Sequence, residues 1–268
     1  MIDAKNIHVE LSGRKILRGV DFCAQSTELT VVLGPNGSGK TTLLRALTGE
    51  LEYSGSIAIN GRDLAFMSAG EQAELRGVLP QSSALAFPFT VREVVDMGRT
   101  TVREVQSSKA SIERVETQLE RVGLNGFAGR HYTHLSGGEK QRVQFARVLH
   151  QIGSTQLDEQ PKWLFLDEPV SSLDIKHQLH IMHIATRFAH SGGGVVAVLH
   201  DLNLAAMFAD QIVILKDGQV AQKGIPKDAL NTTSLREIFE CELNVGALPM
   251  DDAPFVLPHS AISESQNG

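Results

Sequence analysis

The fold of this chain is decided by one short stretch, Gly34-Pro35-Asn36-Gly37-Ser38-Gly39-Lys40-Thr41. It matches the pattern G-x-x-x-x-G-K-[S/T] at every fixed position. A β-branched apolar run at 29–33 precedes it, and a helical pattern at 42–47 follows. In that order, the backbone N–H groups of the loop and the positive end of the helix face the same anion. The context therefore predicts a phosphate-binding loop rather than a glycine-rich turn that happens to precede a helix.

The last residues of the loop indicate the kind of phosphate compound that it binds. Lys40 supplies a point charge for the β- and γ-phosphates of a nucleotide. Thr41 offers a hydroxyl group to Mg²⁺. The loop therefore predicts a nucleotide site with a divalent cation.

A second apolar run, 163–166, ends in two acidic residues, Asp167 and Glu168. An acid at this strand end holds Mg²⁺ through water in enzymes with a phosphate-binding loop. We therefore expect Asp167 to serve the metal and Glu168 to polarise the attacking water. The alternative for Glu168 is a capping acid at the start of the next turn, and the phosphate loop elsewhere in the chain favours the catalytic interpretation.

The segment Leu135-Ser136-Gly137-Gly138-Glu139 predicts a helix start. Ser136 and Glu139 fit the capping-box pattern S-x-x-E. The capping box does not account for Gly137 and Gly138, and two glycines at a helix start let the backbone approach an anion closely. The glycines therefore favour a second phosphate contact.

Composition excludes several classes of protein. The chain has 268 residues, a hydrophobic share of 42% and a net charge of −6. An acidic chain with 5% aromatic residues is unsuited to broad nucleic-acid binding. No apolar run approaches the ~18–20 residues of a membrane span. The N-terminus lacks the apolar core of a signal peptide, and Cys23 and Cys241 form no disulfide or zinc pattern.

The hydropathy pattern predicts an α/β core with a helical block inserted in it. Strands are expected at 7–11, 16–22, 57–59, 195–199, 212–215 and 219–221, with tight turns at 60–61 and 217–218. Between about 90 and 147 the spacing becomes helical, with Ile112, Val115, Leu119 and Val122 on one apolar face. A polar stretch at 150–162 follows, helices are expected at about 175–189 and after Asp201, and the tail after Pro249 is expected to be poorly ordered.

Three histidines at 177, 180 and 183 raise the question of a metal or haem site. Steps of three residues rotate each side chain by about 60° around a helix. Three such side chains cannot share one tight site, so a solvated helix face is the better interpretation.

These motifs in this order resemble the ATP-binding subunits of ABC transporters, over about residues 2–242. LSGGEKQR lies between GPNGSGKT and LFLDEP, Gln81 matches the family's Q-loop, residues 171–174 match its D-loop, and His200 matches its switch histidine. The resemblance implies a P-loop NTPase (RecA-like) core of the ABC ATPase type, with an antiparallel β subdomain and an inserted helical subdomain. It places the core at about 1–85 and 160–242, the helical subdomain at about 86–159 and a tail at 243–268.

The family's mechanism implies roles for these residues. Two copies dimerise head-to-tail, and each ATP lies between residues 34–42 of one subunit, Thr42 included, and Ser136-Gly137-Gly138 of the other. His200 contacts the γ-phosphate, Gln81 reports nucleotide state to a membrane subunit, and Asp174 links the two sites. The implied cofactors are ATP and Mg²⁺. The implied catalytic residues are Lys40, Gln81, Glu168 and His200, and the implied metal-binding residues are Thr41, Gln81 and Asp167.

Residues 78–99, with LPQ, FPFTVREVV and MGR, resemble the importer subgroup for iron chelates, haem and cobalamin. The extension at 150–162 and the segment GGGVVAVLHDLNL resemble haem importers in particular. The resemblance implies a separate integral-membrane permease, a periplasmic substrate-binding protein, no nucleic-acid partner and a peripheral position on the cytoplasmic face of the bacterial inner membrane. Ferric-siderophore and cobalamin importers remain alternatives, as does, in a different class, a soluble ABC ATPase of iron–sulfur cluster assembly.

Three details bear on how closely the family pattern applies. Leu11 stands where the family often stacks an aromatic residue on adenine, so base recognition is expected to be less selective. Val170 stands where many members have threonine, with little expected effect. Phe87, Pro88 and Phe89 either dock the permease or belong to the local core.

Overall fold

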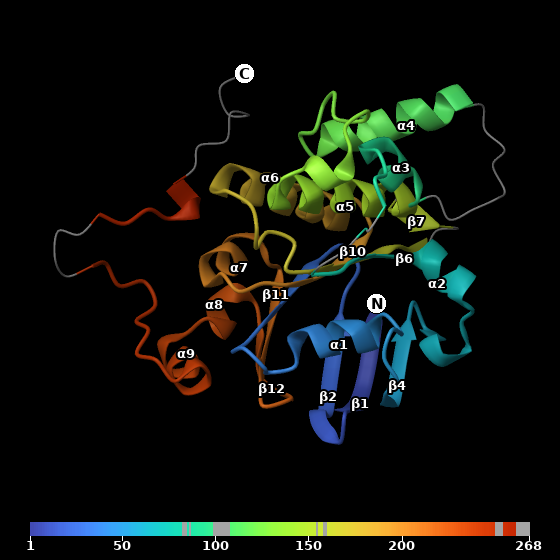
Figure 1. The fold of residues 1–268 in the computed structure, drawn as a ribbon. Helices are drawn as coiled ribbons and strands as arrows, with labels where there is room; N and C mark the ends of the chain where they lie inside the picture. The colour runs from blue at the N-terminus through green and yellow to red at the C-terminus, as the bar shows by residue number, and fades with distance from the viewer. Residues whose placement is uncertain are drawn as a thin grey trace.

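The glycine loop follows an inner strand of a six-stranded sheet in the computed structural model (Figure 1). The structure describes residues 1–81, 85, 87–98, 108–153, 155–157, 160–249 and 254–260. The strand order is β12-β11-β3-β10-β9-β6. The ladders joining β6, β9, β10, β3 and β11 are parallel, and β12 pairs antiparallel with β11. The bounds are β3 Leu29–Leu33, β6 Arg76–Leu79, β9 Trp163–Asp167, β10 Gly194–Val198, β11 Gln211–Lys216 and β12 Gln219–Gly224.

A second, antiparallel sheet has the order β2-β1-β4-β5. Its strands are β1 (Ile2–Leu11), β2 (Arg14–Ala24), β4 (Ser54–Ile59) and β5 (Arg62–Asp63). Asn60 and Gly61 join β4 to β5 with φ values of 52° and 76°, the left-handed pair that a tight hairpin needs. The predicted α/β class with an added antiparallel sheet is confirmed.

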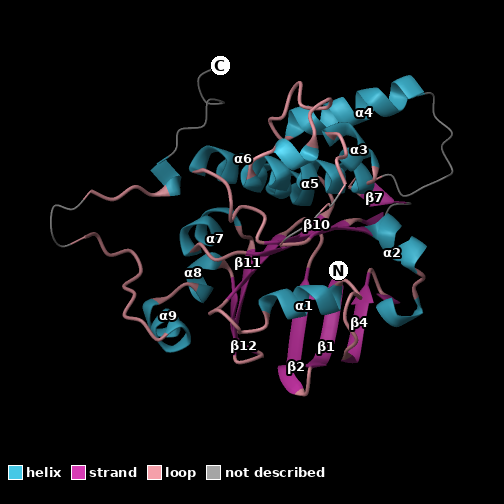
Figure 2. Ribbon diagram, in the orientation of Figure 1, coloured by secondary structure: helices cyan, strands magenta, loops and turns pink. Residues whose placement is uncertain are grey.

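Helices cover both faces of the parallel sheet (Figure 2). Side chains alternate along each strand, so Val32 packs with the core around α1, whereas Val31 and Leu33 pack with α5, α6 and α7 on the other face. The same alternation divides β9 and β10. The α-helices are α1 Lys40–Leu47, α2 Ala69–Leu75, α3 Val91–Asp96, α4 Ser108–Arg121, α5 Gly137–Ile152, α6 Ile175–His190, α7 Leu202–Phe208, α8 Pro226–Ala229 and α9 Thr232–Phe239.

The predicted helical block is present as α3, α4 and α5, with one correction. Val115, Leu119 and Val122 are buried as expected, but Ile112 is 40% exposed. Ile112 lies near the beginning of α4, one turn before the buried Val115. The apolar face predicted from spacing is therefore one turn shorter than the sequence pattern.

The polar stretch at 150–162 is more structured than expected. Helix α5 continues to Ile152, and two short strands, β7 (Gln156–Leu157) and β8 (Gln160–Pro161), pair antiparallel. Lys162 Nζ donates to the Ile152 carbonyl at 2.7 Å, and Asn60 Nδ2 donates to the Pro161 carbonyl at 2.8 Å. These long-range bonds hold a segment whose own sequence carries no clear periodicity.

Part of the predicted tail can also be placed. Val245 N–H donates to Thr232 Oγ1 at 3.1 Å, and a single 3₁₀ turn, Pro258–Ser260, packs near α7. Residues 250–253 and 261–268, on which the expectation of poor order largely falls, lie outside the described part of the chain. Within that part, no helix combines the length and apolar character needed to cross a bilayer.

Gly194 is a position where the sheet needs a glycine. A Cβ there would lie 2.4 Å from Cζ3 of the buried Trp163 ring on the neighbouring strand. We expect Gly194→Ala to lower the free energy of unfolding by about 2 kcal/mol, because a close-packed core has no space for the methyl group. Chemical denaturation measures this. The control is Gly129→Ala, whose Cβ would meet nothing within 4 Å, and equal stability of the two variants would contradict the expectation.

Candidate functional site

Most of the site residues predicted from the sequence follow the carboxyl ends of strands of the parallel sheet, and these ends lie at one edge of the sheet. Val198 at the end of β10 lies between Val32 of β3 and Asp167 of β9, and Leu79 of β6 pairs with Leu166. The carboxyl ends of these strands therefore deliver the glycine loop, the two acids, His200 and Gln81 to the same side of the sheet. This edge is where open α/β sheets bind their ligands.

The glycine loop takes a path that side chains would block. Gly34 has φ 146°, and a Cβ there would lie 2.2 Å from the Leu215 carbonyl oxygen. Gly39 has φ 102°, and its Cβ would lie 2.8 Å from Leu17 Cδ2. Gly39 is also the N-cap of α1 and has no side chain to cap the first turn. The N–H groups that begin α1 are thus left for an external acceptor such as a phosphate oxygen.

Lys40 folds back over the loop. Its Nζ donates to the carbonyl oxygens of Gly34 and Pro35, both at 2.9 Å. Burial lowers the pKa of Lys40, and the charges of Glu168 and Asp167 act in the opposite direction. Beside it, the buried Ser38 Oγ has no hydrogen-bond partner among the described residues. A buried cation and an unpaired hydroxyl group fit a loop that receives an anionic ligand.

The side-chain oxygens of Asp167 and Thr41 lie side by side next to the loop. Thr41 Oγ1 donates to Asp167 Oδ1 at 3.2 Å. Asp167 is buried at the end of β9, and desolvation raises the pKa of its carboxyl group. A buried carboxylate and a hydroxyl oxygen suit Mg²⁺, because this cation prefers oxygen ligands and is commonly held by one or two carboxylates together with phosphate oxygens. The residues present therefore fit the expected cation.

Glu168 is held in an unusual backbone conformation. Its φ is 51°, in the left-handed region, which costs a non-glycine residue on the order of 1–2 kcal/mol. The Glu168 N–H donates to the Val198 carbonyl at 3.1 Å, and the Glu168 carbonyl accepts from Gln141 Nε2 at 2.8 Å. Both peptide groups that flank Glu168 Cα are therefore fixed from outside the turn.

The carboxylate of Glu168 meets His200. The distance from His200 Nε2 to Glu168 Oε1 is 2.5 Å, and the two side chains are 44% and 14% exposed. Sequence reasoning placed both residues in the site but did not foresee this contact, because it joins positions 32 apart. Gln81 lies exposed just beyond β6.

The LSGGE segment has the predicted capping box. Ser136 Oγ accepts from the N–H of Glu139, whose carboxylate in turn accepts from the Ser136 N–H at 2.7 Å. A Cβ on Gly138 would lie 3.0 Å from the Ser172 carbonyl oxygen, so packing explains this glycine, which sequence reasoning had reserved for a phosphate contact. A Cβ on Gly137 would meet nothing within 4 Å. Only Gly137 therefore lacks an explanation within the chain.

Asp174 has a structural role that sequence reasoning did not predict. It is the N-cap of α6, where Oδ1 accepts from the His177 N–H at 2.9 Å and lies 2.7 Å from His177 Nδ1. The bond from the His177 backbone lowers the pKa of Asp174. Any contact of Asp174 with a second subunit would come in addition to this cap.

The three histidines have separate partners. His177 faces Asp174, His180 Nε2 lies 2.7 Å from the Arg121 carbonyl oxygen, and the His183 ring packs edge-on against Phe208. In the described ranges, no group of three His, Cys, Asp or Glu side chains could hold a metal ion. The expected solvated helix face holds for His183, which is exposed, whereas His177 and His180 are half-buried against their partners.

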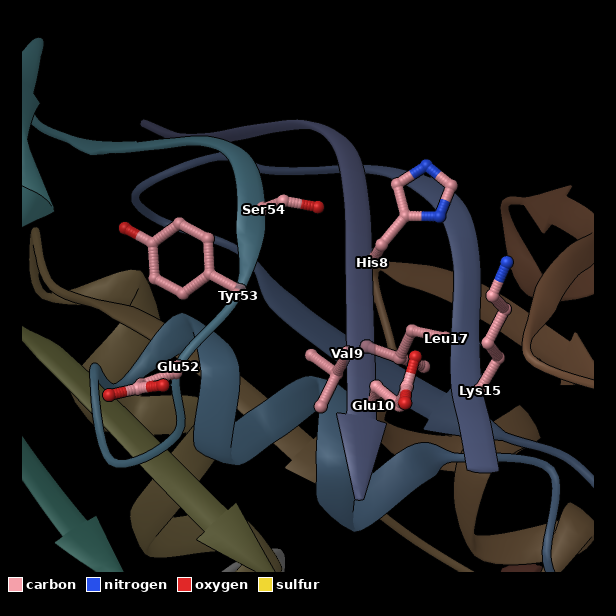
Figure 3. Close-up of a pocket in the computed structure, with 8 residues that line it drawn as sticks. All are labelled: His8, Val9, Glu10, Lys15, Leu17, Glu52, Tyr53 and Ser54. Carbon is pink, nitrogen blue, oxygen red and sulfur yellow. The ribbon is translucent and has the colours of Figure 1, made fainter. Parts of the chain in front are cut away.

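A hollow of about 590 Å³ lies in the antiparallel sheet, where β1 continues past the start of β4 (Figure 3). Leu17, in its wall, is the residue that a Cβ on Gly39 would strike. Tyr53, also in its lining, lies across the hollow from Leu17 and Lys15 (Figure 3). Leu11 itself is half-exposed at the end of β1. Less selective base recognition stays a prediction.

Comparisons with known proteins agree with this geometry. Residues 17–171 match the family described as ABC transporter. The hemin import ATP-binding protein HmuV of Mesorhizobium japonicum is 53% identical over 262 residues, which cover 98% of this chain and 100% of the relative. The protein of the same name from Rhizobium johnstonii is 50% identical over 263 residues, covering 98% and 99% of the two chains.

Among solved structures, the dimeric post-hydrolysis state of the ATP-binding cassette MJ0796 bound to ADP and Pi superimposes with a TM-score of 0.75. It is 26% identical and covers 84% of this chain and 99% of its own. The predicted fold and family are confirmed. The chain belongs to the ABC transporter family, as one of its ATP-binding, ATP-hydrolysing subunits.

Proposed function

We propose that this chain is the ATPase subunit of a bacterial ABC importer that takes up haem (hemin) through a separate membrane permease. The observation that carries the proposal is its 53% identity, over nearly the whole length of both chains, with a protein named for hemin import. The residues needed for hydrolysis are present and grouped at one sheet edge. ABC ATPase subunits use such a site to drive a partner rather than to bind the cargo, so the cargo rests on the similarity alone.

In the proposed nucleotide complex, residues 34–42 surround the phosphates of ATP. Lys40 exchanges the carbonyls of Gly34 and Pro35 for the β- and γ-phosphates. The exchange is favourable because a buried ammonium group gains anionic partners in place of neutral ones. Thr41 and Asp167 would hold Mg²⁺, together with Gln81, which lies just beyond β6. When bound, Mg²⁺ supplies positive charge to the phosphate oxygens.

In the proposed hydrolysis step, Glu168 accepts hydrogen bonds from the attacking water and draws off its proton. Water oxygen bonds to the γ-phosphorus as the bond to the bridging oxygen of ADP breaks, so the products are ADP and phosphate. His200, 2.5 Å from the Glu168 carboxylate, would keep that carboxylate directed into the site and is proposed to contact the γ-phosphate.

The site of one chain is proposed to be completed by a second copy. Ser136, Gly137 and Gly138 at the N-terminus of α5 would face the γ-phosphate held by the partner's loop, and Asp174 would lie between the two sites. The open surface at Gly137 supports this arrangement. The solved MJ0796 cassette with ADP and Pi is dimeric, which supports the arrangement by analogy.

Glu168→Gln tests the hydrolytic site. General-base help is typically worth 10²–10⁴-fold, so we expect kcat for Mg-ATP to fall by at least 100-fold while ATP binding persists. The uncleaved nucleotide should then hold a dimer that size-exclusion chromatography detects with ATP but not with ADP. If the variant stays monomeric at saturating ATP, with or without the permease, the sandwich arrangement is wrong.

The permease contact is proposed to include Phe87. The sequence left open whether residues 87–89 belong to the surface or the core, and the described side chains divide between the two. Phe87 is 70% exposed, whereas Phe89 packs against the core and its backbone pairs with Tyr132. An exposed aromatic residue six positions after Gln81 is well placed to join a membrane subunit to the nucleotide site.

Phe87→Ala should weaken co-purification with the permease at least fivefold and leave the ATPase activity of the isolated chain within twofold of wild type. Burial of a large aromatic side chain at an interface supports an effect of this size. Leu248→Ala is the control, because Leu248 is equally exposed, at 71%, in the C-terminal segment. Unchanged co-purification of Phe87→Ala would place the contact elsewhere.

The cargo is tested with the complete transport system, in which this chain is proposed to lie on the cytoplasmic face of the inner membrane. The chain should co-purify with an integral-membrane permease, and a haem-loaded periplasmic binding protein should stimulate ATP hydrolysis in proteoliposomes. The same assay with ferric siderophore or cobalamin and their binding proteins is the control. Stimulation by one of these and not by haem would reassign the cargo and leave the ATPase function intact.

A further inference from the structure

Gln141 is a polar residue outside the set proposed to bind and cleave ATP. It lies in the first turns of α5, half-buried, five residues after Ser136. Its Nε2 donates to the Glu168 carbonyl at 2.8 Å, and its Oε1 accepts from the Ser172 N–H at 3.4 Å. One side chain therefore joins the helix of the LSGGE segment, the acid after β9 and the loop before Asp174.

The contact falls on the strained residue of the site. With φ at 51°, Glu168 depends on its surroundings to keep its peptide groups in place, and the direction of its carboxylate follows from that backbone. Val198 fixes the N–H side at 3.1 Å. On the carbonyl side Gln141 makes the shortest bond, and two longer contacts come from Ser171, at 3.3 and 3.4 Å.

We propose that Gln141 is a positioning residue for ATP hydrolysis, which acts by holding the backbone of Glu168 in its own chain. The proposal rests on the proposed function, in which Glu168 is the base and α5 begins at the partner's nucleotide. If α5 moves when its N-terminus contacts that nucleotide, Gln141 transmits the movement to Glu168 of its own chain. The two sites of a dimer are thereby connected by one hydrogen bond in each subunit.

The first test compares Gln141→Met with Gln178→Met. Methionine keeps the length of glutamine but cannot donate. Gln178 donates to Leu173 and Val170 of the same loop, at 3.0 and 3.4 Å, and has no bond to Glu168. We expect Gln141→Met to lower kcat at least tenfold with KM for ATP within twofold of wild type. Gln178→Met should keep kcat within twofold.

A kcat within twofold of wild type for Gln141→Met, or an equal loss in Gln178→Met, would overturn the proposal, because the effect would then be absent or a general effect on the loop. Thermal unfolding monitors folding of both variants. If Gln141→Met does not fold, Gln141→Glu replaces it, since glutamate can accept from Ser172 but cannot donate to Glu168.

The second test separates action on Glu168 from damage to the surface that meets the partner's nucleotide. Heterodimers are purified through two different tags, and wild type paired with Glu168→Gln is the reference. When Gln141→Met and Glu168→Gln lie on different chains, the one intact Glu168 lacks its Gln141, and the rate should fall at least tenfold. When both lie on the same chain, the rate should equal the reference.

The opposite pattern would mean that Gln141 serves the partner's nucleotide, and the proposal would be wrong. If the reference heterodimer has no activity, the homodimer comparison of kcat and KM decides alone. Failure of the proposed function would look different, since Glu168→Gln would then form no ATP-dependent dimer, whether glutamine or methionine stands at 141.

Discussion

Parallel pairing of β3, β10, β9 and β6 is the constraint on which the site depends. Parallel strands end at a common edge, and here the register places Val198 between Val32 and Asp167. A slip of one residue in either ladder would turn Asp167 toward the opposite face of the sheet and away from Thr41. The site is therefore fixed by hydrophobic alternation in the strands, since Val31 and Val32 must enter different cores.

The same edge carries charge that the fold must tolerate. Lys40 and Asp167 are both buried, and burial lowers the pKa of the first and raises that of the second. Each shift reflects a cost of keeping the charged form out of water. Lys40 offsets its cost with two carbonyl oxygens, and Asp167 with the Thr41 hydroxyl. These are weaker partners than the phosphates and divalent cation that we propose bind here, so the exchange of partners on binding would be favourable.

Local signals in the sequence predicted most of the fold. The capping box at Ser136 and Glu139 and the turn at Asn60-Gly61 involve residues at most three apart, so their chemistry can be read without knowing the fold. The pairing of β7 with β8 was missed because bonds from distant residues, such as Asn60, hold this segment.

Long-range contacts explain what the sequence could not supply at the site. The types and positions of Lys40, Asp167 and Glu168 were recognisable because they stand in motifs. The contacts of Gln141 with Glu168, 27 residues away, and of His200 with the same acid, 32 residues away, follow only from the packing of α5 and β10 around β9. Gln141 stands within the LSGGEKQR motif, yet nothing in the residue type or its spacing indicates the carbonyl that it meets.

Gly137 and Gly138 show how the structure divides a sequence motif into two kinds of requirement. Gly138 is needed inside the chain, because any side chain would press on the Ser172 carbonyl. Gly137 begins α5 with an ordinary helical backbone and has open space where its Cβ would stand. Neither backbone conformation nor packing accounts for a glycine there. The proposed contact with a phosphate held by a second copy would account for it, because such an approach requires bare backbone N–H groups.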